Sequence, residues 1–347
     1  MKPTLKSWIK WLAPLVVLIV ALVAFRDELP FLGEAFYTLL EASPLPLVFA
    51  VLTAVGAIVA MAEVMRLLMN SGNDFDVSLK DTTAITLASN AWSTSLPGGP
   101  AFSAWLTYRV QRSWGASVAL CGWFFVVSSV ISTMWLVLIG IGAVLFLGAE
   151  LNLLTLLATL ALTVLVIFAV YWATRNPDTL RRWVSRLPTK LRGSAVKVVD
   201  QLATVEMSGR AFAGASAYSL LNRLLDAMTL YFAVWAVVDI APGFTADQNQ
   251  TTIMGVALAY VMAKLAGTAQ ITPGGVGTVE ALTAGALVAS GMTLVDATAA
   301  TLIYRIISFA LITLIGWIVY LVRYAGKGYM LGRVSPAADT KDAGAKD

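Results

Sequence analysis

The sequence contains no histidine and a single cysteine, Cys121, which lies within an apolar run. Without histidine there is no imidazole for acid–base catalysis and no Cys/His metal site, and one cysteine forms no intramolecular disulfide. A phosphate-binding loop of the G-x-x-x-x-G-K-[ST] type is also missing. We therefore predict no bound metal, no cofactor and no enzymatic activity, and we assign Cys121 to packing.

Charge is scarce as well. Charged residues make up 13% of the chain against 59% hydrophobic residues, and the mean hydropathy is +0.79, whereas soluble domains have about 25% charged residues. The apolar residues form runs of roughly 20, long enough to cross ~30 Å of hydrocarbon as helices. Runs such as 12–25 and 161–173 are apolar on every face, which excludes the alternation of a membrane β-strand. The basic residues form no folded basic surface, so no nucleic-acid partner is predicted.

Six stretches are predicted to span the membrane as helices. The first, ending at Phe25, follows Trp8 and Trp11, which suit an interfacial anchor; a cleaved signal peptide is the alternative. The other five spans are predicted at 45–69, 116–147, 153–174, 211–238 and 294–322.

The Lys/Arg excess lies at the N-terminus, in the loop 175–210 and just after the last span. By the positive-inside rule both termini are therefore cytoplasmic. Within the loop, apolar residues recur at helical spacing between 180 and 187, opposite arginines. This pattern is typical of a basic amphipathic helix on an anionic leaflet, with a solvated linker as the alternative.

Two further segments are apolar but interrupted. Residues 81–95 are polar for a membrane helix and run into Pro97-Gly98-Gly99, and residues 251–271 run into Pro273-Gly274-Gly275-Val276-Gly277. Proline and glycine break a helix at both points, and neither flank spans a bilayer by itself. We therefore predict two re-entrant hairpins whose broken backbone is buried in protein.

The predicted topology makes the first hairpin start and end in the cytoplasm and the second start and end outside. The expected division is an N-terminal helix and external loop (1–44), repeat 1 (45–148), a linking helix with the basic loop (149–210), repeat 2 (211–325) and a polar tail (326–347). The predicted fold is an all-α polytopic membrane protein with about six full transmembrane helices and two re-entrant Pro-Gly-Gly hairpins arranged as inverted repeats. Secondary transporters place their sites where such broken helices meet.

A short helix follows each Pro-Gly-Gly, and its N-terminus would attract a phosphate that the glycines allow to approach closely. The alternative is that the glycines only permit tight packing. Glu280 lies one turn past the second tip, and Arg305 lies within the last span. An arginine fork suits a lipid phosphate, while a structural Glu280–Arg305 salt bridge is the alternative. The candidate lipid- or phosphate-binding residues are Asn90, Pro97, Gly98, Gly99, Arg109, Pro273, Gly274, Gly275, Gly277, Glu280, Tyr304 and Arg305.

Other polar residues within the spans are candidates for coupling or for structural charge pairs, because such residues are costly in hydrocarbon. Arg223 and Asp226 lie three residues apart and are expected to pair, whereas Arg66, Arg109 and Arg112 are placed to snorkel to the interface. The candidates are Glu63, Asn222, Arg223, Asp226 and Lys264.

Several of these positions carry a resemblance to a known family. Asn90, Pro97-Gly98-Gly99, Arg109, Pro273–Gly277, Glu280, Gly291 and Tyr304-Arg305 resemble the transmembrane region of lysylphosphatidylglycerol synthases and its stand-alone flippase-like relatives, over about residues 8–325. In the bifunctional synthases this region is similar to a lipid flippase, and a separate cytosolic domain makes the aminoacyl lipid. Only about 25 residues follow the last helix here, so the resemblance implies transport without lipid synthesis.

The leading expectation is a flippase that moves an anionic phospholipid or a polyprenyl-phosphate-linked glycolipid between leaflets of a bacterial or archaeal cytoplasmic membrane. Its partners would be those lipids and, as candidates, enzymes of envelope biosynthesis; no oligomeric state is predicted. The alternatives are a membrane-embedded enzyme with Glu280 as base and an accessory subunit of lipid or glycan biosynthesis without transport.

Overall fold

A computed structural model describes residues 37–38, 40–72, 76–96, 98–146, 208–269 and 272–327, with eight single residues between 157 and 182. All the regular structure in this described part is helical. The predicted spans at 12–25 and 153–174, the basic stretch up to 207 and the tail beyond 327 lie, apart from those single residues, outside it.

Four described helices are long and apolar enough to cross a membrane. They are α3 (Pro44–Met69), α6 (Val118–Phe146), α10 (Gly209–Val238) and the last span, Leu294–Arg323. Each agrees within two residues with one of the predicted spans, which confirms the helical membrane fold for this part of the chain. The last span is not continuous, because α13 (Leu294–Arg305) and α14 (Ile312–Arg323) flank a π-helical segment, Ile306–Leu311.

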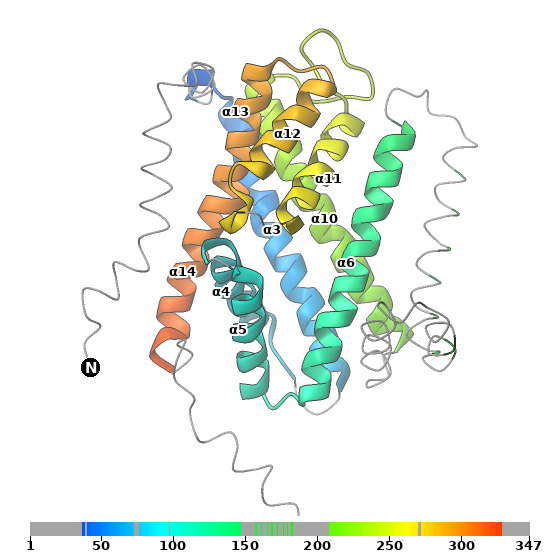
Figure 1. The fold of residues 1–347 in the computed structure, drawn as a ribbon, viewed down its shortest axis with the longest axis vertical. Coiled ribbons are helices and arrows are strands. Elements are labelled where there is room, and N and C mark those ends of the chain that lie inside the picture. Colours follow the sequence, from blue (N-terminus) through cyan, green and yellow to red (C-terminus); the bar gives the residue numbers. More distant parts are fainter. Residues whose placement is uncertain are drawn as a thin grey trace, which may run out of the picture.

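Two helical hairpins lie between the spans. The first consists of α4 (Leu79–Ser95) and α5 (Gly99–Ser113), and the second of α11 (Ile253–Ala269) and α12 (Thr278–Ala289). Both turns fall at the predicted Pro-Gly-Gly stretches. In Figure 1 the first hairpin extends from the lower end of the molecule, the second extends from the upper end, and their turns face each other near mid-height.

Helices α3 and α10 pack against each other in opposite directions. Polar contacts join them along the first half of α3, since Ser43 N–H donates to the Ala236 carbonyl at 2.8 Å and Thr53 Oγ1 lies 3.1 Å from Thr229 Oγ1. A Cβ at Gly56 would lie 3.1 Å from Leu225 Cδ1, so a larger residue there would require the Leu225 side chain to shift. Small residues and hydroxyl contacts are typical of helix pairs in membranes, where apolar burial alone gives no driving force.

The last span contacts the two hairpins in succession. Its first half, α13, packs against α12, while its second half, α14, packs along α4. Two contacts fix the second packing: Thr94 Oγ1 lies 2.9 Å from Thr313 Oγ1, and Trp317 Nε1 donates to Ser95 Oγ at 3.0 Å. The π-helical segment therefore lies where the span passes from one hairpin to the other.

Candidate functional site

The two hairpin turns are in contact. Gly274 has φ +63°, and a Cβ there would lie 2.5 Å from Phe309 Cε2 and 2.9 Å from the carbonyl oxygen of Thr94. Thr94 belongs to the last turn of α4, so the second turn lies directly against the end of the first hairpin's leading helix. Glycine is required at position 274 both for the left-handed backbone and for the space.

Glu280 and Arg305 form an ion pair beside this contact. Arg305 Nε donates to Glu280 Oε1 at 2.6 Å, and Arg305 Nη2 donates to the carbonyl of Gly274 at 2.9 Å. The Glu280 side chain is 26% exposed and the Arg305 side chain is 13% exposed. The arginine of the last span thus holds the turn of the second hairpin. The two residues bind each other, as the salt-bridge alternative predicted.

The two short helices begin differently. In α12 the first turn is capped from within, because Glu280 Oε2 accepts the Gly277 N–H at 2.6 Å. Helix α5 follows Gly98, which has φ +66° and provides no side-chain cap. Gly98 is exposed, and no heavy atom lies within 4 Å of a Cβ built on it. At α5 the Gly99 N–H donates to the Leu96 carbonyl, Pro100 has no N–H and the Ala101 N–H donates to the Gly98 carbonyl. The positive end of the helix dipole, rather than a set of free N–H groups, is therefore what α5 offers an anion, whereas at α12 that end is already occupied by a carboxylate.

Phe309 completes the surroundings of Arg305. The guanidinium carbon lies 4.1 Å from the centroid of the Phe309 ring, and that ring also limits the space at Gly274. Phe309 belongs to the π-helical segment, and single π-helical turns are frequent at functional sites. We did not predict Phe309 or Thr94 as site residues. For Phe309 the sequence did contain a signal, because residues four positions apart, such as Arg305 and Phe309, lie on the same face of a helix.

Other predicted residues lie away from the turns. Arg109 lies ten residues past Gly99 on α5, about 15 Å along the helix, with its guanidinium 5.7 Å from the Trp105 ring. Asn90 lies one turn before Thr94, and its carbonyl accepts the Thr94 hydroxyl at 2.9 Å. Pro97 and the side chain of Pro273 lie outside the described part of the chain.

A second polar cluster lies between α10, α11 and α13, and Asp226 is its centre. Its carboxylate forms an ion pair with Lys264 and accepts the hydroxyls of Tyr304 at 3.1 Å and Tyr260 at 3.4 Å. The predicted Arg223–Asp226 pair is wrong, because Arg223 Nη2 instead donates to Ser132 Oγ on α6 at 2.6 Å. Tyr304, predicted at the lipid site, contributes its hydroxyl to this cluster.

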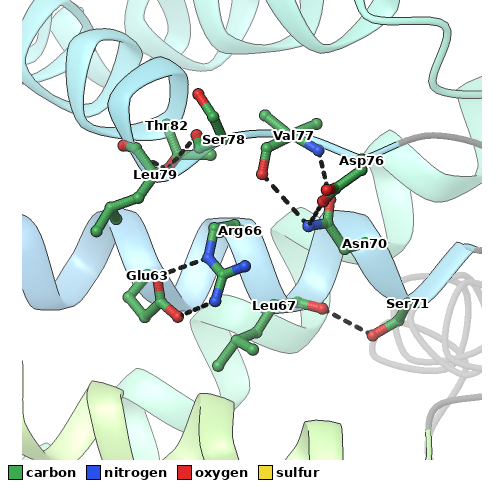
Figure 2. Close-up of polar contacts among 10 residues, drawn as sticks. All are labelled: Glu63, Arg66, Leu67, Asn70, Ser71, Asp76, Val77, Ser78, Leu79 and Thr82. Carbon is green, nitrogen blue, oxygen red and sulfur yellow. Dashed lines mark hydrogen bonds and ion pairs between the residues drawn. The ribbon is translucent and has the colours of Figure 1, made fainter.

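The remaining candidates lie on or against α3. Glu63 and Arg66 form a two-pronged ion pair, with Arg66 Nε 2.8 Å from Oε2 and Nη2 2.5 Å from Oε1, as Figure 2 shows. Arg66, which was expected to snorkel to the interface, therefore also forms an ion pair with a residue of its own helix. Asn222 donates from α10 to the carbonyl of Ala57 at 2.8 Å, which is a structural contact between the two spans.

The sequence was also compared with families of known proteins. A family model described as the lysylphosphatidylglycerol synthase TM region matches residues 10–316, which include both hairpin turns and the Glu280–Arg305 pair. The chain belongs to this family. The predicted resemblance is therefore confirmed, and membership indicates a membrane-embedded protein with a lipid-related, flippase-like role. No curated protein matches the chain.

Proposed function

We propose that this member of the lysylphosphatidylglycerol synthase TM family is a flippase for an anionic phospholipid or a polyprenyl-phosphate-linked glycolipid, and that it performs no synthesis. The observation that carries the proposal is the contact between the two hairpin turns at Gly274 and Thr94. Hairpins that enter from opposite ends and meet in the middle leave a thin barrier between the two sides. Transporters with discontinuous helices bind their substrates at such a barrier.

In this proposal the two hairpins are re-entrant and the units 45–148 and 211–325 are inverted repeats. The first repeat runs as a span, a hairpin and a span, and so does the second, starting from the opposite end of the molecule in Figure 1. The end that carries the turn between α5 and α6 is cytoplasmic, as the distribution of Lys and Arg predicts.

The phosphate of the substrate binds between the open N-terminus of α5 and the guanidinium of Arg305. Arg305 uses Nε for Glu280 and Nη2 for Gly274, so among the described contacts Nη1 remains available. A phosphate offers more acceptor oxygens than one carboxylate and binds an arginine fork strongly. It can therefore compete with Glu280 for Arg305. Releasing Glu280 and loosening the hold of Arg305 on the Gly274 carbonyl would free the second turn to move.

The lipid tails stay in the bilayer while the headgroup crosses. Only the headgroup and phosphate need a polar path, because the tails are already solvated by hydrocarbon. Tyr304, which precedes Arg305 in the chain, donates its hydroxyl to Asp226 and so connects the Asp226–Lys264 cluster to the proposed site. In this scheme the cluster holds the helices around the site and does not bind the lipid.

The test is leaflet-resolved movement of fluorescent lipids in proteoliposomes that contain the purified protein. We expect accelerated movement of anionic phosphatidylglycerol or of a polyprenyl phosphate, with little effect on phosphatidylcholine. Protein-free vesicles and vesicles with heat-inactivated protein are the controls. Equal rates with and without protein for every anionic lipid would reject transport and favour the accessory-subunit alternative, whereas chemical conversion of the lipid would favour the enzyme alternative.

A further inference from the structure

A groove of about 610 Å³ runs between α3 and α10, away from the hairpin turns. Its walls are mostly apolar, and the short stretch before α4, with the first residue of α4, also lines it. The described residues that line it are Gly56, Val59, Ala60, Glu63, Arg66, Asp76, Val77, Ser78, Leu79, Tyr218, Leu221 and Leu225. Gly56 is the lining residue furthest from Arg66 on α3, and a Cβ there would lie 3.1 Å from Leu225 Cδ1, so α3 and α10 approach each other closely at this end.

The charged residues among the described lining lie at one end of the groove. Figure 2 shows Glu63 and Arg66 on α3 with Asp76 and Ser78 in the stretch beside them. Arg66 binds Glu63 through Nε and Nη2. A guanidinium has five N–H donors, so within the described contacts Nη1 is left for a further acceptor. The Arg66 side chain is 34% exposed and that of Glu63 10%, so the arginine is the accessible member of the pair.

The length of the groove matches one leaflet. Arg66 lies three residues before the end of α3, whose last residue is Met69, so it is at the level expected for headgroups. Gly56 lies ten residues earlier, which is about 15 Å along the helix. That is half of the ~30 Å hydrocarbon thickness of a bilayer. A lipid with its phosphate at Arg66 would therefore extend an acyl chain along the apolar walls as far as Gly56, near the midplane.

The balance of charge indicates the headgroup. The described lining has two acidic residues, Glu63 and Asp76, and one basic residue, Arg66. Asp76 is exposed and accepts from Asn70 Nδ2 at 2.7 Å through Oδ1, which leaves Oδ2 for another donor. A purely anionic headgroup would meet an excess of negative charge here. A headgroup with both a phosphate and an ammonium group would satisfy Arg66 and Asp76 together.

We propose that this groove is a binding site for an amine-bearing phospholipid, with its phosphate at Arg66, its ammonium group at Asp76 and one chain between α3 and α10. The site is separate from the hairpin turns and does not depend on the proposed transport. The bound lipid would hold the stretch 76–79 against α3 and α10.

The test uses phosphatidylethanolamine and phosphatidylglycerol with the same acyl chains, added to the full chain in mild detergent. Binding is measured by native mass spectrometry and by the shift in thermal unfolding. Leu221→Trp fills the groove, and Leu224→Trp is its matched control: both leucines lie on α10 at 41% and 44% exposure, but only Leu221 lines the groove. Asp76→Asn removes the proposed ammonium partner.

We expect the parent and Leu224→Trp to bind phosphatidylethanolamine about tenfold more tightly than phosphatidylglycerol, a difference of about 1.4 kcal/mol. Leu221→Trp should lose that binding, and Asp76→Asn should bind both lipids equally. Equal binding by the two tryptophan variants would exclude the groove as the site. Phosphatidylglycerol binding at least as tightly to the parent would overturn the headgroup assignment, and a parent that binds neither lipid would mean that protein fills the groove. Arg305→Ala separates the two proposals, because it should lose transport and keep phosphatidylethanolamine binding.

Discussion

Gly274 and Thr94 belong to different hairpins, yet a Cβ at Gly274 would lie 2.9 Å from the carbonyl oxygen of Thr94. Arg305 holds the carbonyl of the same glycine at 2.9 Å from the last span. One residue thus joins three parts of the chain, the end of α4, the turn before α12 and the start of the π-helical segment. Any movement of the second turn must change these contacts, so position 274 is the most direct test of the proposed barrier.

The first prediction concerns Gly274→Ala. The new Cβ would clash with Phe309 and with the Thr94 carbonyl, and a left-handed backbone costs a residue with a Cβ about 1–2 kcal/mol. We expect lipid movement to fall at least about tenfold, because displacing the turn by the clash disturbs Arg305 as well. The control is Gly285→Ala on α12, where nothing lies within 4 Å of the added Cβ. Transport and thermal unfolding are measured on the same preparations, and an unchanged transport rate for Gly274→Ala would place the barrier elsewhere.

The hairpins could be predicted from the sequence because their signals are local. Proline in a helix interior breaks the helix, and the flanking helices end at Ser95 and Ala269 and resume at Gly99 and Thr278. The contact between the turns depends on residues 180 positions apart, Thr94 and Gly274. Hydropathy and charge patterns predict that the two turns lie at a similar depth, but not which atoms touch.

The charge pairs show where local spacing misleads. Arg223 and Asp226 are three residues apart on α10, a spacing that allows a pair. Asp226 nevertheless binds Lys264 from α11, and Arg223 binds Ser132 from α6. Packing of the spans decides these partners. Arg109 was a candidate for the lipid site, with snorkelling to the interface as the alternative, and the rise of α5 carries it about 15 Å from Gly99.

The second prediction concerns the Asp226–Lys264 pair. Lys264→Met leaves the Asp226 carboxylate with only the hydroxyls of Tyr260 and Tyr304 among its described partners. Removing one partner of a fully buried pair costs roughly 3–5 kcal/mol, and the 28% and 16% exposure of the two side chains should reduce this. We expect lower thermal stability for Lys264→Met and recovery in Lys264→Met/Asp226→Asn. A single variant as stable as the parent would show that the pair contributes nothing to folding.

The third prediction concerns topology. Single cysteines are introduced at Gly72, Ser113 and Gln248 in a Cys121→Ser background, which removes the buried native thiol. Gly72 lies just after α3 and Ser113 is the last residue of α5, and both helices end at the lower end in Figure 1, while the loop between α10 and α11, which holds Gln248, lies at the upper end. We expect a membrane-impermeant thiol reagent to label positions 72 and 113 from the cytoplasmic side and position 248 from outside. Labelling of 72 and 113 from opposite sides would contradict the re-entrant course of the first hairpin.

The last prediction separates the two roles of Arg305. Arg305→Ala leaves Glu280 without its ion-pair partner, and Glu280→Gln leaves Arg305 without its own, so each single variant should lose stability. Glu280→Gln keeps an oxygen that can accept the Gly277 N–H and so preserves the cap of α12. We therefore expect the larger loss of stability for Arg305→Ala, which also releases the Gly274 carbonyl.

The double variant Glu280→Gln/Arg305→Ala decides between the roles. It carries no unpaired charge at this position, so its thermal stability should exceed that of Arg305→Ala. If Arg305 binds the lipid phosphate, the double variant folds but moves anionic lipid no faster than protein-free vesicles. If the pair is only structural, transport returns together with stability. We expect folded protein without transport, because the phosphate competes for a guanidinium that the double variant no longer has. Transport at the parent rate would remove both residues from the lipid site and leave the α5 N-terminus as the remaining candidate.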